Sequence, residues 1–365
     1  LAASRASATL RLVDAEVALA YALRQGTAVA AARHPASPQE DDPLALGGAP
    51  LRELIAWLEF LAVVFPSARA RRDISKLAAI PRAAQLGSGV LPRAAWLIAL
   101  DRQRIDVALP QAGENPGPYW RLCATYTCGL WTLFHMVTVA AAQGAQSIVG
   151  SDASTSEAAK YDALPKIRNF VANFFGCEDC ARHFLDMYDS CGLGRCDLSP
   201  TDARGAALWL WQVHNNVTQR VSRERGLAGE RGLALPAPWP NRTLCGQCWP
   251  RRLGVDGGTG APGSARFDPG AVVDYLKLAY TPAGNAGGAL GAGGVELPGG
   301  VPGWAVFAGI VMAIVLLFVG AAAFRGGAHV DSALRPKAHR GESPHRDRTS
   351  STDSFLTSAL SVTED

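Results

Sequence analysis

Charge is scarce in this sequence, and the charges present nearly cancel. Lys, Arg, Asp and Glu make up 18% of the 365 residues, and the formal net charge is +3. A nucleic-acid-binding protein normally carries a clustered basic stripe, so we expect no nucleic-acid partner. The sequence also contains no GxxxxGK[ST] run, which argues against a P-loop nucleotide site. Its length is sufficient for two domains with sizeable cores.

Cysteine is missing from residues 1–122 and 249–365. The eight cysteines in between fall into four close pairs with none left over: Cys123 and Cys128, Cys177 and Cys180, Cys191 and Cys196, and Cys245 and Cys248. An even count with local pairing favours disulfide bonds in an oxidising compartment. Two of the pairs are CxxC motifs, and this spacing suits either redox exchange or a metal.

Hydrophobic periodicity predicts an all-α protein. Residues 8–110 are expected to be helical, with helices over 10–23 and 51–65 separated by a Pro/Gly/Asp-rich linker at 34–50. Beyond a second break at 112–119 we expect a small bundle of short helices. Its helices are predicted over residues 128–143, 164–175, from near Glu178 onward, 200–221 and 268–280. Ser199 followed by Pro200 predicts the start of the fourth, as an N-cap with proline at the first helical position.

The last part of the sequence predicts a membrane anchor. Residues 282–302 are rich in Gly, Ala and Pro, which predicts a flexible linker. The next 21 residues, from Trp304 to Phe324, carry no charge, which is enough to span a bilayer, so we assign a transmembrane helix to residues 303–324. Lys and Arg follow this segment, so the positive-inside rule places residues 325–365 in the cytosol as a disordered tail.

This topology predicts a single-pass membrane protein of the secretory pathway, in the Golgi or at the cell surface. The cysteine-rich domain is then lumenal or extracellular, in agreement with the cysteine pattern. The chain opens at Leu1 with none of the charged and apolar segments of a secretory signal. We therefore expect a mature or truncated chain whose targeting signal lies upstream.

The segment from Asn173 to Phe184 (NFFGCEDCARHF) carries the main chemical signal. Gly176 is expected to end one helix, so that the CxxC opens the next. There, backbone N–H groups and the helix dipole stabilise a thiolate. Two sulfurs three residues apart lie on one helix face and can form an exchangeable disulfide. On this motif alone, a redox-active disulfide, a structural disulfide and a metal knuckle all remain open.

Three predicted helices each carry a histidine next to aromatic residues. A lone histidine on an apolar helix is usually a satisfied core residue, but helical bundles build cofactor sites from facing helices. Flat aromatic side chains with imidazole and amide groups at their edge suit a planar nucleotide cofactor. The candidates are Trp131 and His135 on the first helix, His183 after the CxxC, and Trp211, His214, Asn215 and Thr218 on the fourth.

Four motifs in this order resemble the Erv/ALR-type flavin domain, and in particular the quiescin sulfhydryl oxidases. They are CGLWTLFH from Cys128, FFGCEDCARHF from Phe174, WLWQVHNNVT from Trp209 and WPNRTLCGQC from Trp239. The resemblance is strong over residues 112–281 and weaker over 8–110. It implies a redox-inactive, Erv-like helical domain at 1–110 and an FAD-binding sulfhydryl oxidase domain at 111–281.

The resemblance implies an FAD-dependent thiol oxidase that passes electrons from dithiols to oxygen and releases hydrogen peroxide. Cys180 would lie against the flavin, and Cys177 would exchange with the incoming dithiol. The implied FAD contacts are Trp131, His135, Asp179, His183, the stretch Trp211 to Thr218, and Trp239.

This sequence departs from the family pattern in three ways. An arginine of the family aligns with Ala124, and a lysine aligns with Pro236, which puts some phosphate or ribose contacts in doubt. No thioredoxin domain with its own CxxC appears within the chain. We therefore expect a thioredoxin-like dithiol donor or thiol-containing proteins as partners.

Two other functions are weighed against thiol oxidation. One is a membrane-anchored zinc-binding module that uses Cys177, Cys180, Cys245 and Cys248, although the two pairs are far apart for a compact zinc fold. The other is a catalytically inactive interaction module. We assign Cys245 and Cys248 a structural or auxiliary role, and Cys191 and Cys196 a local staple. Of two glycosylation sequons, the one at Asn216 is expected to be unused and the one at Asn241 to lie in an exposed turn.

Overall fold

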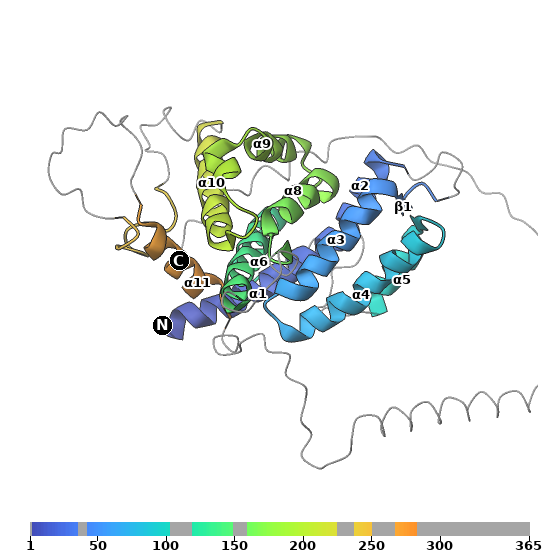
Figure 1. Ribbon diagram of the computed structural model, residues 1–365, viewed down its shortest axis with the longest axis horizontal. Coiled ribbons are helices and arrows are strands. Elements are labelled where there is room, and N and C mark those ends of the chain that lie inside the picture. Colours follow the sequence, from blue (N-terminus) through green and yellow to red (C-terminus); the bar gives the residue numbers. More distant parts are fainter. Residues whose placement is uncertain are drawn as a thin grey trace, which may run out of the picture. The chain divides into compact units, whose positions relative to one another are not determined.

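The computed structural model describes residues 2–35, 42–102, 119–148, 159–224, 237–249 and 267–282. This part of the chain is helical, with one antiparallel pair of very short strands (Figure 1). In chain order the elements are α1 (Ala2–Tyr21), the π-helical turn η1 (Ala22–Gly26), α2 (Thr27–Arg33), β1 (Leu46–Gly47), α3 (Gly48–Val64), α4 (Ala68–Leu86), β2 (Val90–Leu91), α5 (Arg93–Arg102), α6 (Tyr126–Ile148), α8 (Ala163–Phe174), α9 (Glu178–Asp189), the 3₁₀ turn η3 (Gly192–Asp197), α10 (Ala203–Glu224) and α11 (Pro269–Tyr280).

The expected predominance of helix is confirmed, and each helix predicted within the described residues has a counterpart. The predicted linker at 282–302, apart from residue 282, the transmembrane helix at 303–324 and the tail at 325–365 lie outside the described residues. Within the described ranges, no helix is long and apolar enough to cross a membrane.

Two local predictions are wrong. The linker at 34–50 contains β1, which pairs with β2. The helix predicted to start at Pro200 begins instead at Ala203, because Asp202 caps it: its Oδ1 accepts a hydrogen bond from the Gly205 N–H at 2.7 Å. Ser199 uses its hydroxyl within a preceding turn, where it accepts from the Thr201 N–H at 3.3 Å. Aspartate and serine are comparable N-caps, so composition alone does not choose between them.

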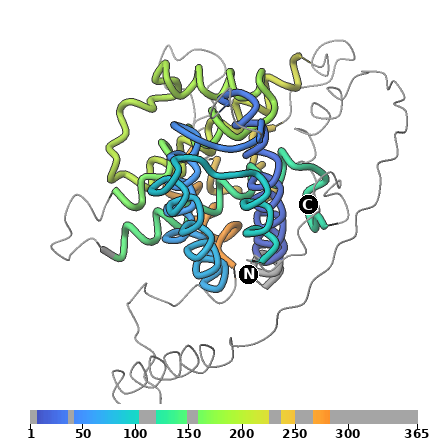
Figure 2. The backbone as a smooth tube through the Cα atoms, turned by 90° about the vertical axis from the view of Figure 1, so that its right-hand side faces the viewer, coloured from blue at the N-terminus to red at the C-terminus, as the bar shows by residue number. Residues whose placement is uncertain are grey.

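Helix α1, at the start of the described chain, packs against helices from its later part. It packs along α6 and also against α11, so that the first and last helices are neighbours (Figures 1 and 2). The fully buried carboxylate of Asp14 on α1 accepts hydrogen bonds from the N–H groups of Arg121, Leu122 and Cys123 at 2.6, 2.8 and 2.9 Å. All described residues belong to one compact unit.

The core runs from α1, α3 and α4 through α6, α8 and α10, and α3 packs against α8. Apolar residues of α8 recur at helical spacing, and this stripe puts Phe170 against Trp57 of α3, with their ring centroids 4.9 Å apart. Phe134 of α6 meets the same pair of rings edge-on. This packing holds the end of α8, and with it the start of α9, in place beside α6 and α10.

Candidate functional site

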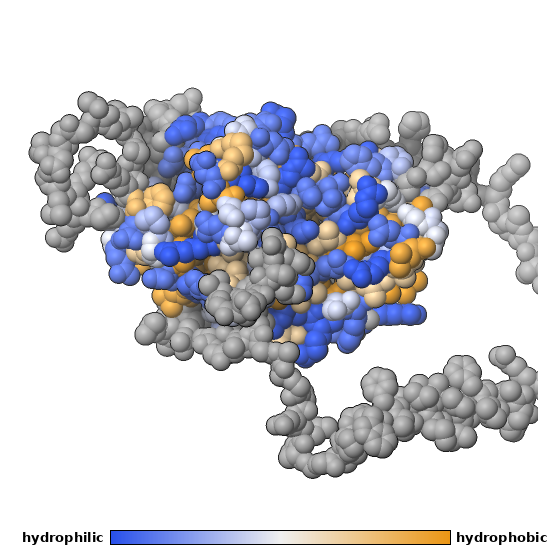
Figure 3. Space-filling model, viewed as in Figure 1, coloured by the Kyte–Doolittle hydropathy of each residue, from blue (hydrophilic) through white to orange (hydrophobic). Residues whose placement is uncertain are grey.

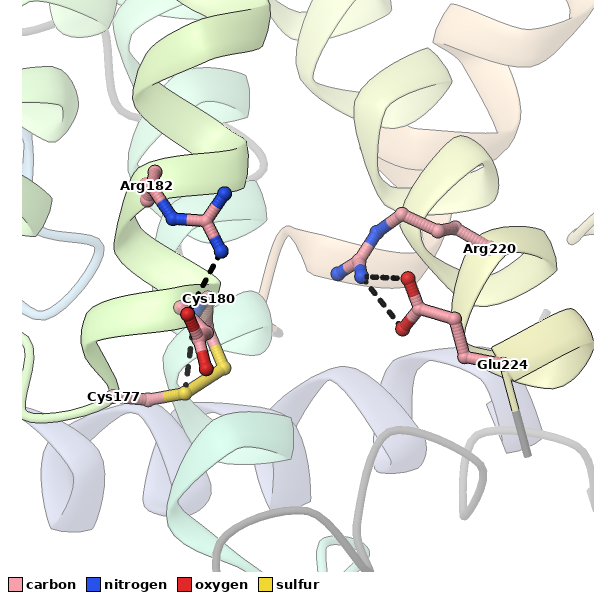
Figure 4. Close-up of polar contacts among 6 residues, drawn as sticks. Cys177, Cys180, Arg182, Arg220 and Glu224 are labelled. Carbon is pink, nitrogen blue, oxygen red and sulfur yellow. Dashed lines mark hydrogen bonds and ion pairs between the residues drawn. A yellow bond between two sulfur atoms is a disulfide. The ribbon is translucent and has the colours of Figure 1, made fainter.

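The Cys177–Cys180 disulfide opens helix α9 (Figure 4). Cys177 is the N-cap residue, and its Sγ accepts a hydrogen bond from the Cys180 N–H at 3.3 Å. Cys180 is the third residue of the helix, within the first turn where free N–H groups and the helix dipole favour negative charge. Both cysteines are half-buried. The predicted placement of the CxxC motif at a helix start is therefore confirmed.

A cavity of about 430 Å³ lies beside this disulfide, between α6, α8, α9 and α10. Cys180 lines it, whereas Cys177 is not among the lining residues. Aromatic side chains form much of its wall: Trp131, Phe134, Phe175 and Phe184. Asp179 and His183, both predicted site residues, also line it. The two sulfurs thus have different surroundings, one in the cavity wall and one outside it.

Two ion pairs face each other across the cavity (Figure 4). On α9, Arg182 donates to Asp179 at 2.8 Å, and this hydrogen bond holds the pKa of the Asp179 carboxyl below its ordinary value. On α10, Arg220 donates to both carboxylate oxygens of Glu224 at 2.6 and 2.7 Å. Hydrophilic residues dominate the surface where α9 and the top of α10 lie (Figure 3). Both arginines that line the cavity already have carboxylate partners.

Residues of η1 and α2 support the loop that carries Cys177. Arg33 donates to the carbonyl oxygen of Phe175 at 3.1 Å and lies 3.6 Å from the carboxylate of Glu178. Gly26 is packed so closely that a Cβ there would lie 2.7 Å from the Phe174 carbonyl oxygen. The loop is therefore braced from the N-terminal region, a support that no motif in the sequence indicates.

A buried histidine pair adjoins the cavity. His135 on α6 and His214 on α10 are joined by a 2.9 Å hydrogen bond between Nε2 and Nδ1, and Trp131 stacks on His214 with ring centroids 4.3 Å apart. Burial lowers the pKa of His214 to about 4. Burial, and then the nearby His214 and Arg11, hold the pKa of His135 well below its ordinary value. Both rings are therefore neutral at pH 7.

Trp211, Asn215 and Trp239 form a hydrogen-bonded clip beside the histidines. Trp211 Nε1 and Asn215 Nδ2 both donate to the Trp239 carbonyl, at 2.6 and 2.8 Å. Asn215 Oδ1 accepts from the Trp239 N–H at 2.7 Å. The Thr218 hydroxyl donates to the His214 carbonyl at 3.0 Å. These polar groups hold the Trp239 segment against α10, and they place the Trp239 ring 5.7 Å from that of His135.

The residues fit a flat, largely apolar cofactor such as the ring system of FAD. The cavity has a volume typical of ligand sites, aromatic walls and a few polar groups at its edge. The fully buried Nδ1 of His135 has no hydrogen-bond partner among the described residues, and such an atom normally requires one. His135 and His214 do not themselves line the cavity, and they adjoin it through Trp131, which lines it and stacks on His214.

The other three cysteine pairs are also disulfides: Cys123–Cys128, Cys191–Cys196 and Cys245–Cys248. Cys245 and Cys248 are buried in the core, whereas the Cys191–Cys196 bridge is exposed in the 3₁₀ turn after α9. Zinc binds thiolate sulfur, so the alternative zinc module would need both the Cys177–Cys180 and the Cys245–Cys248 bridge opened. The described residues contain no cluster of three or more metal-binding side chains.

Several cavity residues were missed from the sequence. Phe175, Phe184, Arg220, Val221 and Glu224 all line the cavity. The last three continue the stripe of α10 that carries His214, at spacings of three and four residues, so the helical periodicity was a usable signal. Phe175 and Phe184 flank the CxxC motif, and only the packing of α8 and α9 decides that they face the cavity.

Comparison with known proteins gives a consistent result. Residues 128–231 match the model of the Erv1 / Alr family. Human Sulfhydryl oxidase 1 is 36% identical over 157 residues, and Sulfhydryl oxidase 1 of Oryza sativa subsp. japonica is 29% identical over 226 residues. The solved sulfhydryl oxidase fragment of human QSOX1 has a TM-score of 0.53 and 29% identity. The family resemblance inferred from the four motifs is confirmed.

These matches differ in how much of each protein they cover. The match to the human relative covers 43% of this chain but only 18% of the relative's own length. The match to the rice relative covers 56% of this chain and 38% of the relative's length. The solved fragment covers 74% of this chain and is itself covered to 94%. The likeness to the solved fragment therefore extends well beyond the family-matched segment into the other helices.

Proposed function

We propose that this chain, which carries an Erv/ALR-type domain similar to that of the sulfhydryl oxidases, is an FAD-dependent thiol oxidase that makes disulfides. One observation carries the proposal: the Cys177–Cys180 disulfide opens α9 with Cys180 in the wall of an aromatic cavity and Cys177 outside the lining. A purely structural bridge needs no such difference between its two sulfurs.

The chemistry at the disulfide follows from this arrangement. A thiolate of the incoming dithiol attacks Cys177 Sγ, the Cys177–Cys180 bond breaks, and Cys180 leaves as a thiolate. The free N–H groups at the start of α9 stabilise that thiolate. The second substrate thiol then attacks the mixed disulfide and releases Cys177. The substrate has lost two electrons and two protons, and the cysteine pair holds two electrons next to the cavity.

FAD, when bound, supplies the two-electron acceptor that hands these electrons on to oxygen, with hydrogen peroxide as product. In the proposal, Trp131, Phe134 and Phe184 enclose its ring system and Cys180 contacts it. His135, His214 and Trp239 hold the rest of the cofactor, and Asp179 and His183 border it. Trp211, Asn215 and Thr218 contribute to this binding by holding Trp239 and the His214 turn.

Thiol-containing proteins or a thioredoxin-like dithiol donor are the proposed reductants, and oxygen is the proposed acceptor. Residues 303–324 are proposed to anchor the protein in a membrane of the secretory pathway, Golgi or cell surface, with the oxidase domain lumenal or extracellular. The sequence support for this location is the uncharged segment and the four cysteine pairs.

The test combines a spectrum with a rate. The purified full chain is expected to absorb near 450 nm, as oxidised flavoproteins do, and to consume oxygen in the presence of dithiothreitol. The Cys177→Ser/Cys180→Ser double variant should keep the flavin and lose the oxygen consumption. Cys191→Ser/Cys196→Ser is the matched control, because it also removes one short local bridge, which lies outside the cavity lining. A wild-type chain with flavin but no thiol oxidation would point to an inactive interaction module, and one with zinc and no flavin to the metal module.

A further inference from the structure

Arg11 of α1 lies at the edge of the aromatic cluster next to the histidine pair. Its guanidinium carbon is 5.4 Å from the centre of the Tyr280 ring. Tyr280 is buried and stacks on His135 with ring centroids 5.0 Å apart, and it also meets Trp239 at 6.0 Å. A residue from the first helix of the chain thus reaches the group of side chains that we assign to the cofactor.

The guanidinium of Arg11 is half-buried, and its recorded partners are neutral. Nη1 donates to the Ser7 hydroxyl at 2.8 Å and to the Ala279 carbonyl at 3.2 Å. Within the described ranges, no carboxylate lies at ion-pair distance from it, in contrast to Arg182 and Arg220, which are paired with Asp179 and Glu224. A half-buried cation beside an apolar cluster is best stabilised by an anion.

The other groups in this cluster cannot balance a negative charge. His135 and His214 are neutral at pH 7, because burial lowers the pKa of both. Burial also raises the pKa of Tyr275 and Tyr280, so both phenols stay protonated. An anion bound at this cluster would therefore find its positive charge on Arg11.

We propose that Arg11 binds the diphosphate of FAD and so makes α1 part of the cofactor site. This inference rests on the proposed function, in which the cofactor extends from the cavity to the histidine pair; Arg11 does not line the cavity itself and is placed beside that pair by Tyr280. Arginine suits the role because its planar donors match two phosphate oxygens at once. The N-terminal helices, expected from the sequence to form a redox-inactive domain, would then contribute directly to cofactor affinity.

The test measures flavin affinity in the flavin-stripped full chain by the quenching of flavin fluorescence. Arg11→Met keeps most of the aliphatic stem over Tyr280 and removes the charge. It is expected to raise the dissociation constant of FAD by about tenfold to a hundredfold and to leave that of riboflavin, which has no phosphate, unchanged. Arg11→Lys should recover part of the FAD affinity, and the salt dependence of FAD binding should be weaker in Arg11→Met than in wild type.

Arg82→Met is the matched control, since it removes one guanidinium that pairs with Glu59 between α4 and α3. It should change neither affinity. Equal FAD affinity in Arg11→Met and wild type would overturn the inference, and so would an equal loss for FAD and riboflavin, which would mean that Arg11 only packs against Tyr280. Absence of FAD binding by the wild-type chain would instead overturn the proposed function. If Arg11→Met does not fold, the salt dependence of FAD binding to the wild-type chain decides the matter. A dissociation constant that does not change with salt concentration would then overturn the inference.

Discussion

At the scale of single residues, the two sulfurs of the CxxC motif have different surroundings, which match the two roles proposed for them. Cys180 lies in the cavity wall and in the first turn of α9, whereas Cys177 caps the helix and is not among the lining residues. A cysteine beside the cavity suits contact with the cofactor, and a cysteine outside its lining suits contact with substrate. The spacing of the motif shows that the pair can be a disulfide, and the cavity shows which member has which neighbour.

The first prediction separates these two roles. Cys177→Ser should retain flavin and show a long-wavelength charge-transfer band from the Cys180 thiolate. Cys180→Ser should retain flavin without the band, because a serine hydroxyl at this position offers no thiolate to donate. Both should lose most oxidation of dithiothreitol. The visible spectrum and oxygen uptake are the measurements, and parental rates in both single variants would refute the assignment.

The second prediction concerns the buried histidines. In the folded protein the pKa of His214 is about 4, and the pKa of His135 is lowered as well. In the unfolded chain both histidines have a pKa near 6.5. The unfolded state therefore binds more protons between these values, so stability is full above about pH 6.5 and is lost as the pH falls toward 4. We expect His214 alone to account for about 3 kcal/mol of unfolding free energy across this window.

Urea denaturation at pH 7 and pH 4.5 measures this effect. His214→Gln should flatten the pH dependence relative to wild type, because Gln does not titrate. His34→Gln is the matched control, since His34 is exposed and its loss should leave the slope unchanged. The same slope in the His214 variant, His34 variant and wild type would show that the histidine pair does not control acid stability.

At the scale of elements, the segment from α1 to α2 supports the loop that carries Cys177. The π-helical turn η1 brings Gly26 against the end of α8, and α2 carries Arg33, which donates to the Phe175 carbonyl. π-Helical turns are rare and occur frequently at functional sites. Here the turn permits a backbone approach that a side chain would block.

The third prediction tests this contact with Gly26→Ala. The new Cβ would lie 2.7 Å from the Phe174 carbonyl oxygen, so the end of α8 must move. We expect the free energy of unfolding to fall by about 1–3 kcal/mol. The strain outweighs the preference of about 1 kcal/mol that alanine has over glycine in a helix. We also expect slower oxidation of dithiothreitol.

Thermal unfolding and oxygen uptake measure the two effects of Gly26→Ala. Gly246→Ala is its control, because a Cβ there would lie at an ordinary 3.5 Å from the Arg242 carbonyl oxygen. A Gly26→Ala protein as stable and active as the control variant would show that the close approach does not matter.

At the scale of the whole molecule, the proposed path of electrons through these 365 residues starts at Cys177. Of the four disulfides, only Cys177–Cys180 contributes a sulfur to the cavity lining. Cys245–Cys248, the second CxxC, is buried, which hinders attack by an external thiolate. In the proposed reaction, a large reduced protein would therefore have to deliver its thiols to one half-buried sulfur at the start of α9.

The fourth prediction follows from that access. The 365-residue chain should oxidise dithiothreitol with peroxide release but oxidise a reduced unfolded protein poorly. A separate thioredoxin-like protein should rescue the latter, because it presents an exposed dithiol, and tethering it should help further by raising its effective concentration to about millimolar. Oxygen consumption with each substrate is the measurement. Equal efficiency without the helper would mean that Cys177 meets protein thiols directly.

Sequence by itself determined the features that depend on near neighbours in the chain. Helical periodicity indicated α1, α3, α6, α8, α9, α10 and α11, with most of their ends within a few residues, but it did not delimit α2, α4 or α5. The spacing of the cysteines indicated the four local pairs. The family motifs led to the proposed redox pair, Cys177 and Cys180, and to aromatic and histidine residues that lie near it. The start of α10 was missed because Ser199 and Asp202 are both good N-caps, and only packing selects between them.

Tertiary structure alone decided the features that join distant parts of the chain. Arg11 reaches the Ala279 carbonyl across 268 positions, Asp14 holds the backbone around Cys123, and Arg33 braces the Phe175 carbonyl. No local pattern marks these residues, because an arginine or aspartate on a helix is ordinarily solvated and its partner is set by which helices pack together. For this reason the sequence predicts the cysteine chemistry, whereas the part that α1 and α2 play in the site becomes visible only in the folded bundle.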